Sequence, residues 1–428
     1  MHCVVDPREY RSFCFRGEGR ANLVISAKSR DSGTRIVWRF SKARKSGLIT
    51  LKAKSELVNR YMENMITPFF SSNYLVAPRI VGMSVADVHQ IAKIPSLLSN
   101  IKIESFGELK QLPDELSLLP LSNVPKGCST ITALEMLDAT RIPQQITSYI
   151  GPTITVEIKP KQGFFQIHPG VRLPYCNNCI LQIEKCGSDH FTQMYDFCPL
   201  DLFSGVHFRV CRSLRELFRN PHRNLRLFVN GNLLFSNEAP ASDSTIKTAL
   251  FPHDNGNIED LVSALALILT GSPSVDSFGL YKNSVLDEIL AGQQIDSIGI
   301  IRAHKLFKNL PQEDKNYFME KARLPSLDDF LHKTDAKSLI ERYLLAATMK
   351  DCSVMVSVRL VPSHMIQSST DYNNIVRLPN GLCFSFSVKI VDLDPKSPKN
   401  LLNAISRFIT GVKIMKLENC QRRPCFQE

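Results

Sequence analysis

Two aspartates have the type and the positions that phosphoryl transfer needs. Asp351 lies between a helical pattern and a strand pattern, and Asp392 directly follows another strand pattern. If these strands pair, both carboxylates lie near one part of a sheet, where one can accept a hydroxyl proton and the other can hold Mg²⁺ against phosphates. Taken singly, each aspartate is more typical of a helix end or a turn than of a catalytic residue, and Asp394-Pro395 in particular indicates a turn.

Two lysines flank a proline where a third strand pattern, over residues 153–158, ends. Pro160 fixes its own φ and has no N–H donor, so this end cannot continue as an interior strand. A stiff backbone therefore holds Lys159 and Lys161 where a sheet gives way to a loop, which suits an anion with several charged groups. The simpler interpretation is an edge strand with two solvated lysines.

Composition limits the classes of protein that fit. The chain has 428 residues, of which 43% are hydrophobic, and this length favours two domains. Its net charge of +11 favours an acidic partner, such as nucleic acid, an anionic membrane or a polyphosphorylated small molecule. Twelve cysteines, no signal peptide pattern and no apolar run that could span a bilayer predict a soluble intracellular protein, cytoplasmic, nuclear or both, with free thiols.

The patterns around these residues predict mixed helices and strands. A Gly-rich turn joins strand-like runs at 13–16 and 23–26. No helix follows it, and the chain contains no Gly-Lys dipeptide, which excludes a dinucleotide fold and a P-loop. A kinase-type hairpin over a triphosphate and an ordinary tight hairpin both remain. We also predict strands at 35–40, 134–138, 225–229, 354–358 and 384–390, helices at 55–69, 176–185, 261–270 and 335–349, a loop at 198–205, and a connection between lobes at 142–152.

The lysine motif carries a resemblance to a known family. Glu157-Ile158-Lys159-Pro160-Lys161, followed by Gly163-Phe164, resembles the signature of the inositol-pentakisphosphate 2-kinases. These enzymes use ATP to phosphorylate the last free hydroxyl of an inositol ring that carries five phosphates. Similar blocks follow in order along most of the chain, at 16–24, 39 with 42–44, 199–205, 224–226 with 230–231, 343–348 with 350–353, and 392–393.

The resemblance implies an α/β fold of two lobes, distantly related to protein kinases, with antiparallel sheets and flanking helices. We assign the nucleotide-covering hairpin and the adenine side to an N-terminal lobe, residues 1–141. The inositol phosphate site and the catalytic aspartates fall in a C-terminal lobe, residues 142–428. The implied ligands are ATP and Mg²⁺ in the cleft, and the implied partner of a monomeric enzyme is inositol pentakisphosphate, with neither membrane nor nucleic acid.

The resemblance also implies a role for each matched residue. Asp351 is the acid/base, Lys159 bridges nucleotide and substrate, and Asp392 holds Mg²⁺ together with Asp351. Five phosphates of about −1.5 to −2 each require many converging cations. The implied ATP contacts are Gly19, Arg20, Ala21, Asn22, Arg39, Leu137, Asp138, Ala139, Glu157, Lys159, Arg226 and Asp392, and the implied substrate contacts are Arg44, Lys161, Lys185, Arg223, Asn224 and Lys396.

Several positions depart from the family pattern, and they are mostly substrate contacts. Residues 80–140 contain no Arg, Leu181 replaces a His, and Arg223 replaces an Asn. Asn400 and Ala404 stand where an Arg and a Tyr follow the position of Lys396. Another inositol polyphosphate is therefore an alternative acceptor, and a weak or inactive inositol-polyphosphate-binding protein is an alternative function.

A nucleic-acid-binding protein is the main alternative from another class. The segment 161–165 is similar to an RNA-recognition strand, and the net charge agrees. The order of the predicted elements does not match that fold, however, and we do not expect a nucleic-acid partner.

Four residues have the spacing of a zinc site. Cys176, Cys179, Cys186 and His190 form Cys-x2-Cys-x6-Cys-x3-His. Because 176–185 reads as one continuous helix, which would spread these ligands apart, we expect free thiols and no zinc. The Cys/His zinc cluster of plant members of the family is also missing, since residues 296–334 contain no cysteine.

Overall fold

The structure is a computed structural model that divides into two compact units. Unit 1 comprises residues 1–63 and 76–141, and unit 2 comprises residues 64–75 and 142–428. The residues described are 3–18, 22–41, 49–97, 101–124, 126–142, 149–168, 172–187, 196–320, 323–362, 366, 374–417 and 422–425.

The segment 64–75 belongs to unit 2, whereas the sequence assigned it to the N-terminal lobe. Its backbone extends the sheet of unit 2, because the Ile390 amide donates to the Tyr74 carbonyl at 2.8 Å. The Ser71 amide and hydroxyl both donate to the Glu288 carboxylate. Hydrogen bonds between residues more than 200 positions apart therefore decide where the unit boundary lies.

Unit 1 is built on a largely antiparallel sheet, in which the described strands follow the order β1-β5-β7-β4-β3-β2-β6. Apolar side chains of one sheet face pack on α2 and α3. At their centre Trp38 is fully buried, and its Nε1 donates to Glu135 at 2.9 Å. The bounds are β1 Cys3–Val4, β2 Tyr10–Glu18, β3 Asn22–Ser29, β4 Arg35–Ser41, α1 Ile49–Tyr61, β5 Arg79–Ser84, α2 Val85–Ile91, β6 Ile103–Ser105, α3 Phe106–Gln111 and β7 Thr130–Leu137.

The helix predicted at 55–69 is confirmed only in part. The α-helical conformation of α1 begins at Ile49 and ends at Tyr61. A π-helical turn over Met62–Ile66 and a 3₁₀ turn over Thr67–Phe69 follow it. Pro68 lacks a backbone N–H and cannot continue an α-helix, so the apolar stripe runs on in a different geometry.

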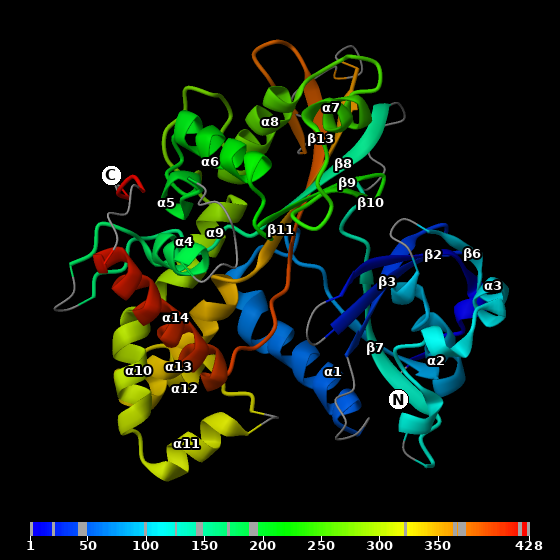
Figure 1. Ribbon diagram of the computed structural model, residues 1–428, viewed down its shortest axis with the longest axis horizontal. Helices are drawn as coiled ribbons and strands as arrows, with labels where there is room; N and C mark the ends of the chain where they lie inside the picture. The colour runs from blue at the N-terminus through cyan, green and yellow to red at the C-terminus, as the bar shows by residue number, and fades with distance from the viewer. Residues whose placement is uncertain are drawn as a thin grey trace. The chain divides into compact units, whose positions relative to one another are not determined.

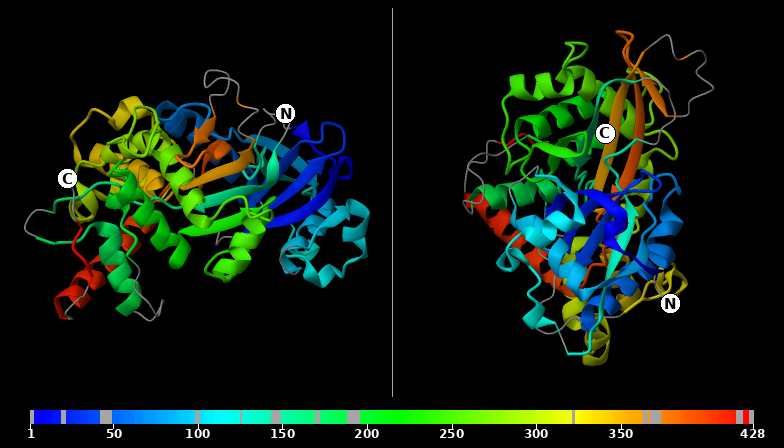
Figure 2. Two further views of the ribbon diagram at one scale, coloured as in Figure 1. Left: turned by 90° about the horizontal axis from the view of Figure 1, so that it is seen from above. Right: turned by 90° about the vertical axis from the view of Figure 1, so that its right-hand side faces the viewer.

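Unit 2 is built on an antiparallel sheet whose described strands follow the order β10-β9-β8-β11-β13-β12. The strand that carries the lysine motif, β8, lies between β9 and β11, so the edge-strand interpretation is wrong. Pro160 does not conflict with this position, because β8 ends at Ile158 and no hydrogen bond of the ladder is lost. The bounds are β8 Ile150–Ile158, β9 Leu225–Val229, β10 Asn232–Phe235, β11 Ser353–Val361, β12 Ile375–Arg377 and β13 Cys383–Val391. Figure 2 shows β11 and β13 side by side.

Helices cover unit 2, and α4, α10, α13 and α14 share one apolar core (Figure 1). The predicted helices at 176–185, 261–270 and 335–349 are confirmed as α4, α8 and α13, and the loop at 198–205 contains the short α5. No described helix is long and apolar enough to cross a membrane. The bounds are α4 Asn177–Gly187, α5 Pro199–Leu202, α6 His207–Arg219, α7 Asp243–Leu250, α8 Ile258–Thr270, α9 Val285–Gln294, α10 Gly299–Asn309, α11 Gln312–Met319, α12 Leu327–Phe330, α13 Ala336–Met349 and α14 Pro398–Leu417.

Candidate functional site

Strand directions bring the predicted catalytic residues of unit 2 to one end of its sheet. Strands β8 and β13 both run antiparallel to β11, so their carboxyl ends lie at the end where β11 begins. The register places Ile158 opposite Val354 and Ser353 opposite Val391. Lys159 and Asp392 are thus the first residues beyond two strands, and Asp351 precedes the strand between them. The meeting of Asp351 and Asp392 depended on the pairing of their two strands, and the pairing of β11 with β13 confirms this condition.

Three ion pairs connect the side chains at this strand end. Lys159 Nζ lies 3.2 Å from Asp392 Oδ2. Asp351 accepts from two lysines, with its Oδ1 3.1 Å from Lys161 Nζ and its Oδ2 2.7 Å from Lys396 Nζ. Both carboxylate side chains are half exposed, and the three lysine side chains are 17–24% exposed. We call these five residues the charged cluster. Its ammonium groups lie close enough to act together on one anion.

The charged cluster carries more positive than negative charge, and its pKa values reflect this. Burial alone would raise the pKa of Asp351, but Lys161, Lys396 and Lys159 lower it well below its usual range. Burial lowers the pKa of Lys161, and although Asp351 opposes this, Lys159 and Lys396 add to it. A polyanionic ligand would neutralise the excess positive charge of these ammonium groups.

Further predicted substrate contacts extend the positive region around the charged cluster. Burial, together with Lys161 and Arg407, lowers the pKa of Lys185 on α4 to about 8. Arg223 contributes to the same shift and pairs with Glu238 at 3.0 Å. Asn224 is buried, and its carbonyl accepts from the Lys159 amide at 2.9 Å, which ties the start of β9 to the lysine motif.

The hydroxyl of Ser353 joins two further predicted residues, Glu157 and Arg226, to the charged cluster. Ser353 Oγ donates to Glu157 Oε1 at 2.9 Å and lies 3.5 Å from Asp392 Oδ2. Arg226 stands opposite Glu157 in the sheet, with its Nη1 3.8 Å from Glu157 Oε2. A continuous polar path therefore runs from Arg226 on β9 to Asp392 after β13.

Two residues of the charged cluster adopt a backbone conformation that is rare outside glycine. Lys161 and Asp392 both have a φ of 62°. A non-glycine residue keeps a positive φ only where the surrounding structure imposes it, and such residues gather at functional sites. The backbone is thus strained at both Lys161 and Asp392.

Gln293 holds the loop that carries Lys161, and no sequence pattern indicated it. Its fully buried amide donates to the carbonyls of Lys161 and Met349 at 2.8 and 3.2 Å, and its Oε1 accepts from the Gly163 amide at 2.8 Å. Gly163 admits no side chain, because a Cβ there would overlap the ring of Phe203. One side chain on α9 therefore fixes the loop relative to the end of α13.

We expect Gln293→Leu to destabilise the protein by about 2–5 kcal/mol, because it leaves two carbonyls and one amide buried without that partner. Urea unfolding would measure the loss. Gln294→Leu is the matched control, since Gln294 is the next residue of α9 and is exposed. Equal stability of the two variants would contradict the anchoring role.

The described nucleotide residues that the sequence predicted in unit 1 lie on β3 and β4 and at the end of β7. Asn22 begins β3, stands opposite Ser41 of β4 and accepts from Ser41 Oγ at 3.3 Å, and Arg39 of β4 stands opposite Val24. Gly19, Arg20, Ala21 and Arg44 lie outside the described residues, as does His190. Asp138 is buried, pairs with Arg16 at 3.0 Å and accepts from Thr140. Its carboxylate thus has structural partners, and beside it Leu137 is exposed.

Unit 1 also contains an apolar pocket, which does not fit a triphosphate. It has a volume of about 190 Å³. Its described lining contains no cation: Glu18, Leu23, Phe40, Ser41, Val88, Ile91, Ala92, Leu118, Leu119 and Ile131.

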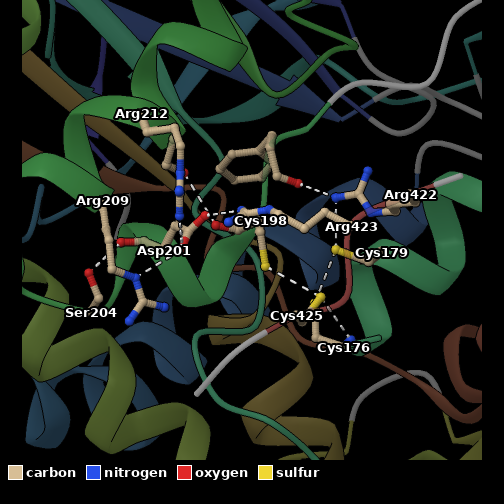
Figure 3. A network of polar contacts seen from close by, with 12 residues as sticks. Cys176, Cys179, Cys198, Asp201, Ser204, Arg209, Arg212, Arg422, Arg423 and Cys425 are labelled. Carbon is tan, nitrogen blue, oxygen red and sulfur yellow. Dashed lines mark hydrogen bonds and ion pairs between the residues drawn. The ribbon is translucent and has the colours of Figure 1, made fainter. Parts of the chain in front are cut away.

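The cysteines that lie together in the structure differ from the set that the sequence spacing suggested. Cys176 and Cys179 lie with Cys198 and Cys425, and the four Sγ atoms are all within 4.8 Å of one another (Figure 3). Cys186 does not belong to this group, because α4 carries it about 10 Å along the helix axis from Cys179. The expectation that the helix would separate the four spaced residues is confirmed for Cys186. The sequence did not indicate that Cys198 and Cys425 would join Cys176 and Cys179.

Comparisons with known proteins agree with one another over nearly the whole chain. Residues 15–404 match the family model described as inositol-pentakisphosphate 2-kinase. An inositol-pentakisphosphate 2-kinase of Arabidopsis thaliana is 26% identical, over 94% of this chain and 92% of its own length. One of Danio rerio is 24% identical, over 92% of this chain and 90% of its own length.

Proposed function

Because the chain belongs to the inositol-pentakisphosphate 2-kinase family, we propose that it transfers the γ-phosphoryl group of ATP to the 2-hydroxyl of inositol 1,3,4,5,6-pentakisphosphate. The product would be inositol hexakisphosphate. The observation that carries this proposal is the charged cluster, in which two carboxylates and three lysines from distant segments meet at one sheet end. The α/β architecture with flanking helices accords with a fold distantly related to the protein kinases.

Asp351 is the proposed acceptor of the hydroxyl proton. In the structure its two oxygens face Lys161 and Lys396, which makes it a weak base. Substrate phosphates would compete for both lysines and so raise the pKa of Asp351 when the hydroxyl arrives. In a loose phosphoryl-transfer transition state, little proton transfer to the base is required before the phosphoryl group moves. Substrate binding itself would therefore activate the carboxylate.

Asp392 and Asp351 are the residues that would hold Mg²⁺. Mg²⁺ prefers carboxylate oxygens, usually one or two, and keeps several of its waters. The half-exposed side chains of both aspartates fit this preference. Bound there, Mg²⁺ would neutralise charge on the ATP phosphates. Lys159 pairs with Asp392, so its ammonium group can orient that carboxylate and contact a phosphate.

Turnover with a defined acceptor tests the proposal directly. The full chain is incubated with Mg-ATP and inositol 1,3,4,5,6-pentakisphosphate, and phosphorus NMR identifies the product. We expect the hexakisphosphate. Tight binding by calorimetry without product would favour the alternative of an inositol-polyphosphate-binding protein, which the replaced substrate contacts motivate. Neither turnover nor binding would reject both functions.

Lys161→Ala should mainly raise the KM for the inositol phosphate. A charge-assisted hydrogen bond contributes about 1.5–3 kcal/mol, which corresponds to about tenfold or more in KM. Steady-state kinetics at saturating ATP would measure this. Lys247→Ala is the matched control, because Lys247 makes a comparable ion pair with Asp254, at 2.7 Å, on α7. An unchanged KM for Lys161→Ala would place this lysine outside the substrate site.

Lys185 should take up protons when the substrate binds near pH 8. With a pKa of about 8, half of the Lys185 side chains are neutral at that pH, and nearby phosphates would favour the charged form. Calorimetry in buffers of different ionisation enthalpy should show about half a proton more uptake for the wild type than for Lys185→Met. The same uptake in both proteins would exclude Lys185 from the binding site.

A further inference from the structure

Lys350 directly precedes Asp351, yet its side chain makes its contacts outside the charged cluster. Its Nζ lies 2.7 Å from Asp296 Oδ2, in the connection between α9 and α10. The Lys350 side chain is only 14% exposed, and that of Asp296 is fully buried. A buried ion pair therefore holds the residue next to the proposed proton acceptor.

Asp296 is itself fixed to the start of α10. Its Oδ1 accepts from the amides of Ile298 and Gly299 at 3.1 and 2.9 Å, and its own amide donates to the Gln293 carbonyl at 3.3 Å. One carboxylate oxygen thus has two amide donors, while the other faces the ammonium group of Lys350. The carboxylate is a rigid point of attachment, because both of its oxygens are bound.

Two aromatic rings also lie beside the ammonium group of Lys350. Its Nζ is 5.1 Å from the centre of the Phe164 ring and 5.8 Å from the centre of the Tyr343 ring. A cation at such distances is attracted to an aromatic ring. Phe164 belongs to the loop that carries Lys161, and Tyr343 belongs to α13. Lys350 therefore connects this loop, α13 and the start of α10.

The carboxylate of Asp351 needs support that the substrate does not remove. In the structure it is held by Lys161 and Lys396, which are also the cations that the substrate phosphates would engage. Among the described contacts, Lys350 takes no part in these ion pairs, so its bond to Asp296 would persist when the substrate binds. The backbone beside Asp351 would then remain fixed while its side chain changes partners.

We propose that Lys350 is a positioning residue, which uses its ion pair with Asp296 to keep Asp351 in place for proton transfer. This inference rests on the proposed function, in which Asp351 accepts the hydroxyl proton. A buried ion pair often adds little net stability over a hydrophobic pair, so the geometry that it imposes is the property that matters here. A misplacement of about 1 Å can reduce a reaction rate by about 10²-fold. Lys350 would thus affect the rate without contacting the substrate.

Steady-state kinetics of Lys350→Met test the proposal once turnover of the wild type is measured. We expect kcat to fall by about 10–100-fold, because the carboxylate of Asp351 is no longer held in the reactive geometry. The KM for the inositol phosphate should stay nearly the same, because Gln293 still holds the backbone of Lys161. A normal kcat in Lys350→Met would overturn the proposal.

A second substitution separates positioning from stability. Lys350→Met alone leaves the Asp296 carboxylate buried without its cation, which is destabilising. Adding Asp296→Asn removes this charge, and the asparagine oxygen can still accept from the amides of Ile298 and Gly299. Urea unfolding of the double variant should show recovered stability, whereas kcat should stay low. If kcat recovers together with stability, Lys350 only stabilises the fold and the proposal is wrong.

Arg323→Met is the matched control for the loss of a buried ion pair. Arg323 pairs with Glu341 of α13, and the two side chains are 11% and 6% exposed, so the pair is buried to a degree comparable with that of Lys350 and Asp296. This variant should lose stability and keep its kcat. An equal fall of kcat in Arg323→Met would show that any such loss on α13 slows the reaction, which would contradict a specific role of Lys350.

Hydrogen exchange measures the positioning of Asp351 without turnover. The amides of Lys350 and Asp351 donate to the carbonyls of Ala346 and Thr348 at 2.9 and 3.1 Å. In ligand-free protein, mass spectrometry of peptides from the end of α13 should show faster exchange of these amides in Lys350→Met, but not in Arg323→Met. A wild type without turnover would reject the proposed function. Equal exchange in the wild type and Lys350→Met would overturn the role of Lys350 whether or not the wild type is active.

Discussion

Asp351→Asn should lose turnover by about 10²–10⁴-fold in kcat while keeping its affinity for inositol phosphates. The amide preserves the shape of the side chain but cannot accept the hydroxyl proton, and general acid–base groups contribute a factor of this size. Affinity should stay the same or rise, because the substitution removes the negative charge that Lys161 and Lys396 now face. Steady-state kinetics and calorimetry on the same preparation would measure both effects.

The opposite movement of rate and affinity separates a catalytic role from a structural one. A variant that merely loosens the charged cluster would lose both. Asp314→Asn is the matched control, since Asp314 is a partly exposed carboxylate 3.3 Å from Lys337 on another part of unit 2. Normal kcat in Asp351→Asn would remove the acid/base role, and loss of inositol phosphate binding would indicate a structural one.

The sequence predicted the elements around the charged cluster of unit 2 because each one has a local signal. Alternating apolar residues define β8, β11 and β13, and Asn230-Gly231, with φ values of 50° and 80°, closes the hairpin of β9 and β10. Asp351 and Asp392 could then be brought together by assuming that two strands pair, which β11 and β13 do.

Other features depend on contacts that the sequence does not encode locally. Whether β8 is an edge or an interior strand is decided by its neighbours β9 and β11, and a proline beyond the strand end carries no information on this point. Gln293 is one of two adjacent glutamines, and only the fold makes one buried and the other exposed. Single residues of this kind have no motif to reveal them.

The cysteines illustrate the same limit. The spacing of Cys176, Cys179 and Cys186 resembles a ligand set, but an α-helix separates the third thiol from the first two. Cys425 joins the group from almost 250 residues away because two hydrogen bonds hold residues 422–425 in place. The Cys425 amide donates to the Pro174 carbonyl, and the Tyr175 hydroxyl donates to the Arg422 carbonyl. A search for closely spaced ligands therefore selects the wrong partners.

Asp392→Asn should raise the Mg²⁺ concentration needed for half-maximal turnover by at least about tenfold. Even groups that only orient a metal ligand alter metal affinity by about 10–100-fold, and this change removes a charged oxygen from the proposed ligand itself. Asparagine is the appropriate substitution, because it tolerates the positive φ of 62° that Asp392 adopts, so the backbone need not move. Loss of the pair with Lys159, at 3.2 Å, would add to the effect.

Manganese binding distinguishes a metal ligand from a residue that only orients Lys159. Electron paramagnetic resonance with Mn²⁺ and ATP reports metal binding without turnover, and we expect the bound signal to weaken in Asp392→Asn. Asp254→Asn is the matched control, because Asp254 also pairs with a lysine, at 2.7 Å, and should leave Mn²⁺ binding unchanged. If Asp392→Asn binds Mn²⁺ normally but needs more ATP, the carboxylate acts through Lys159, and Asp351 remains as the proposed metal ligand.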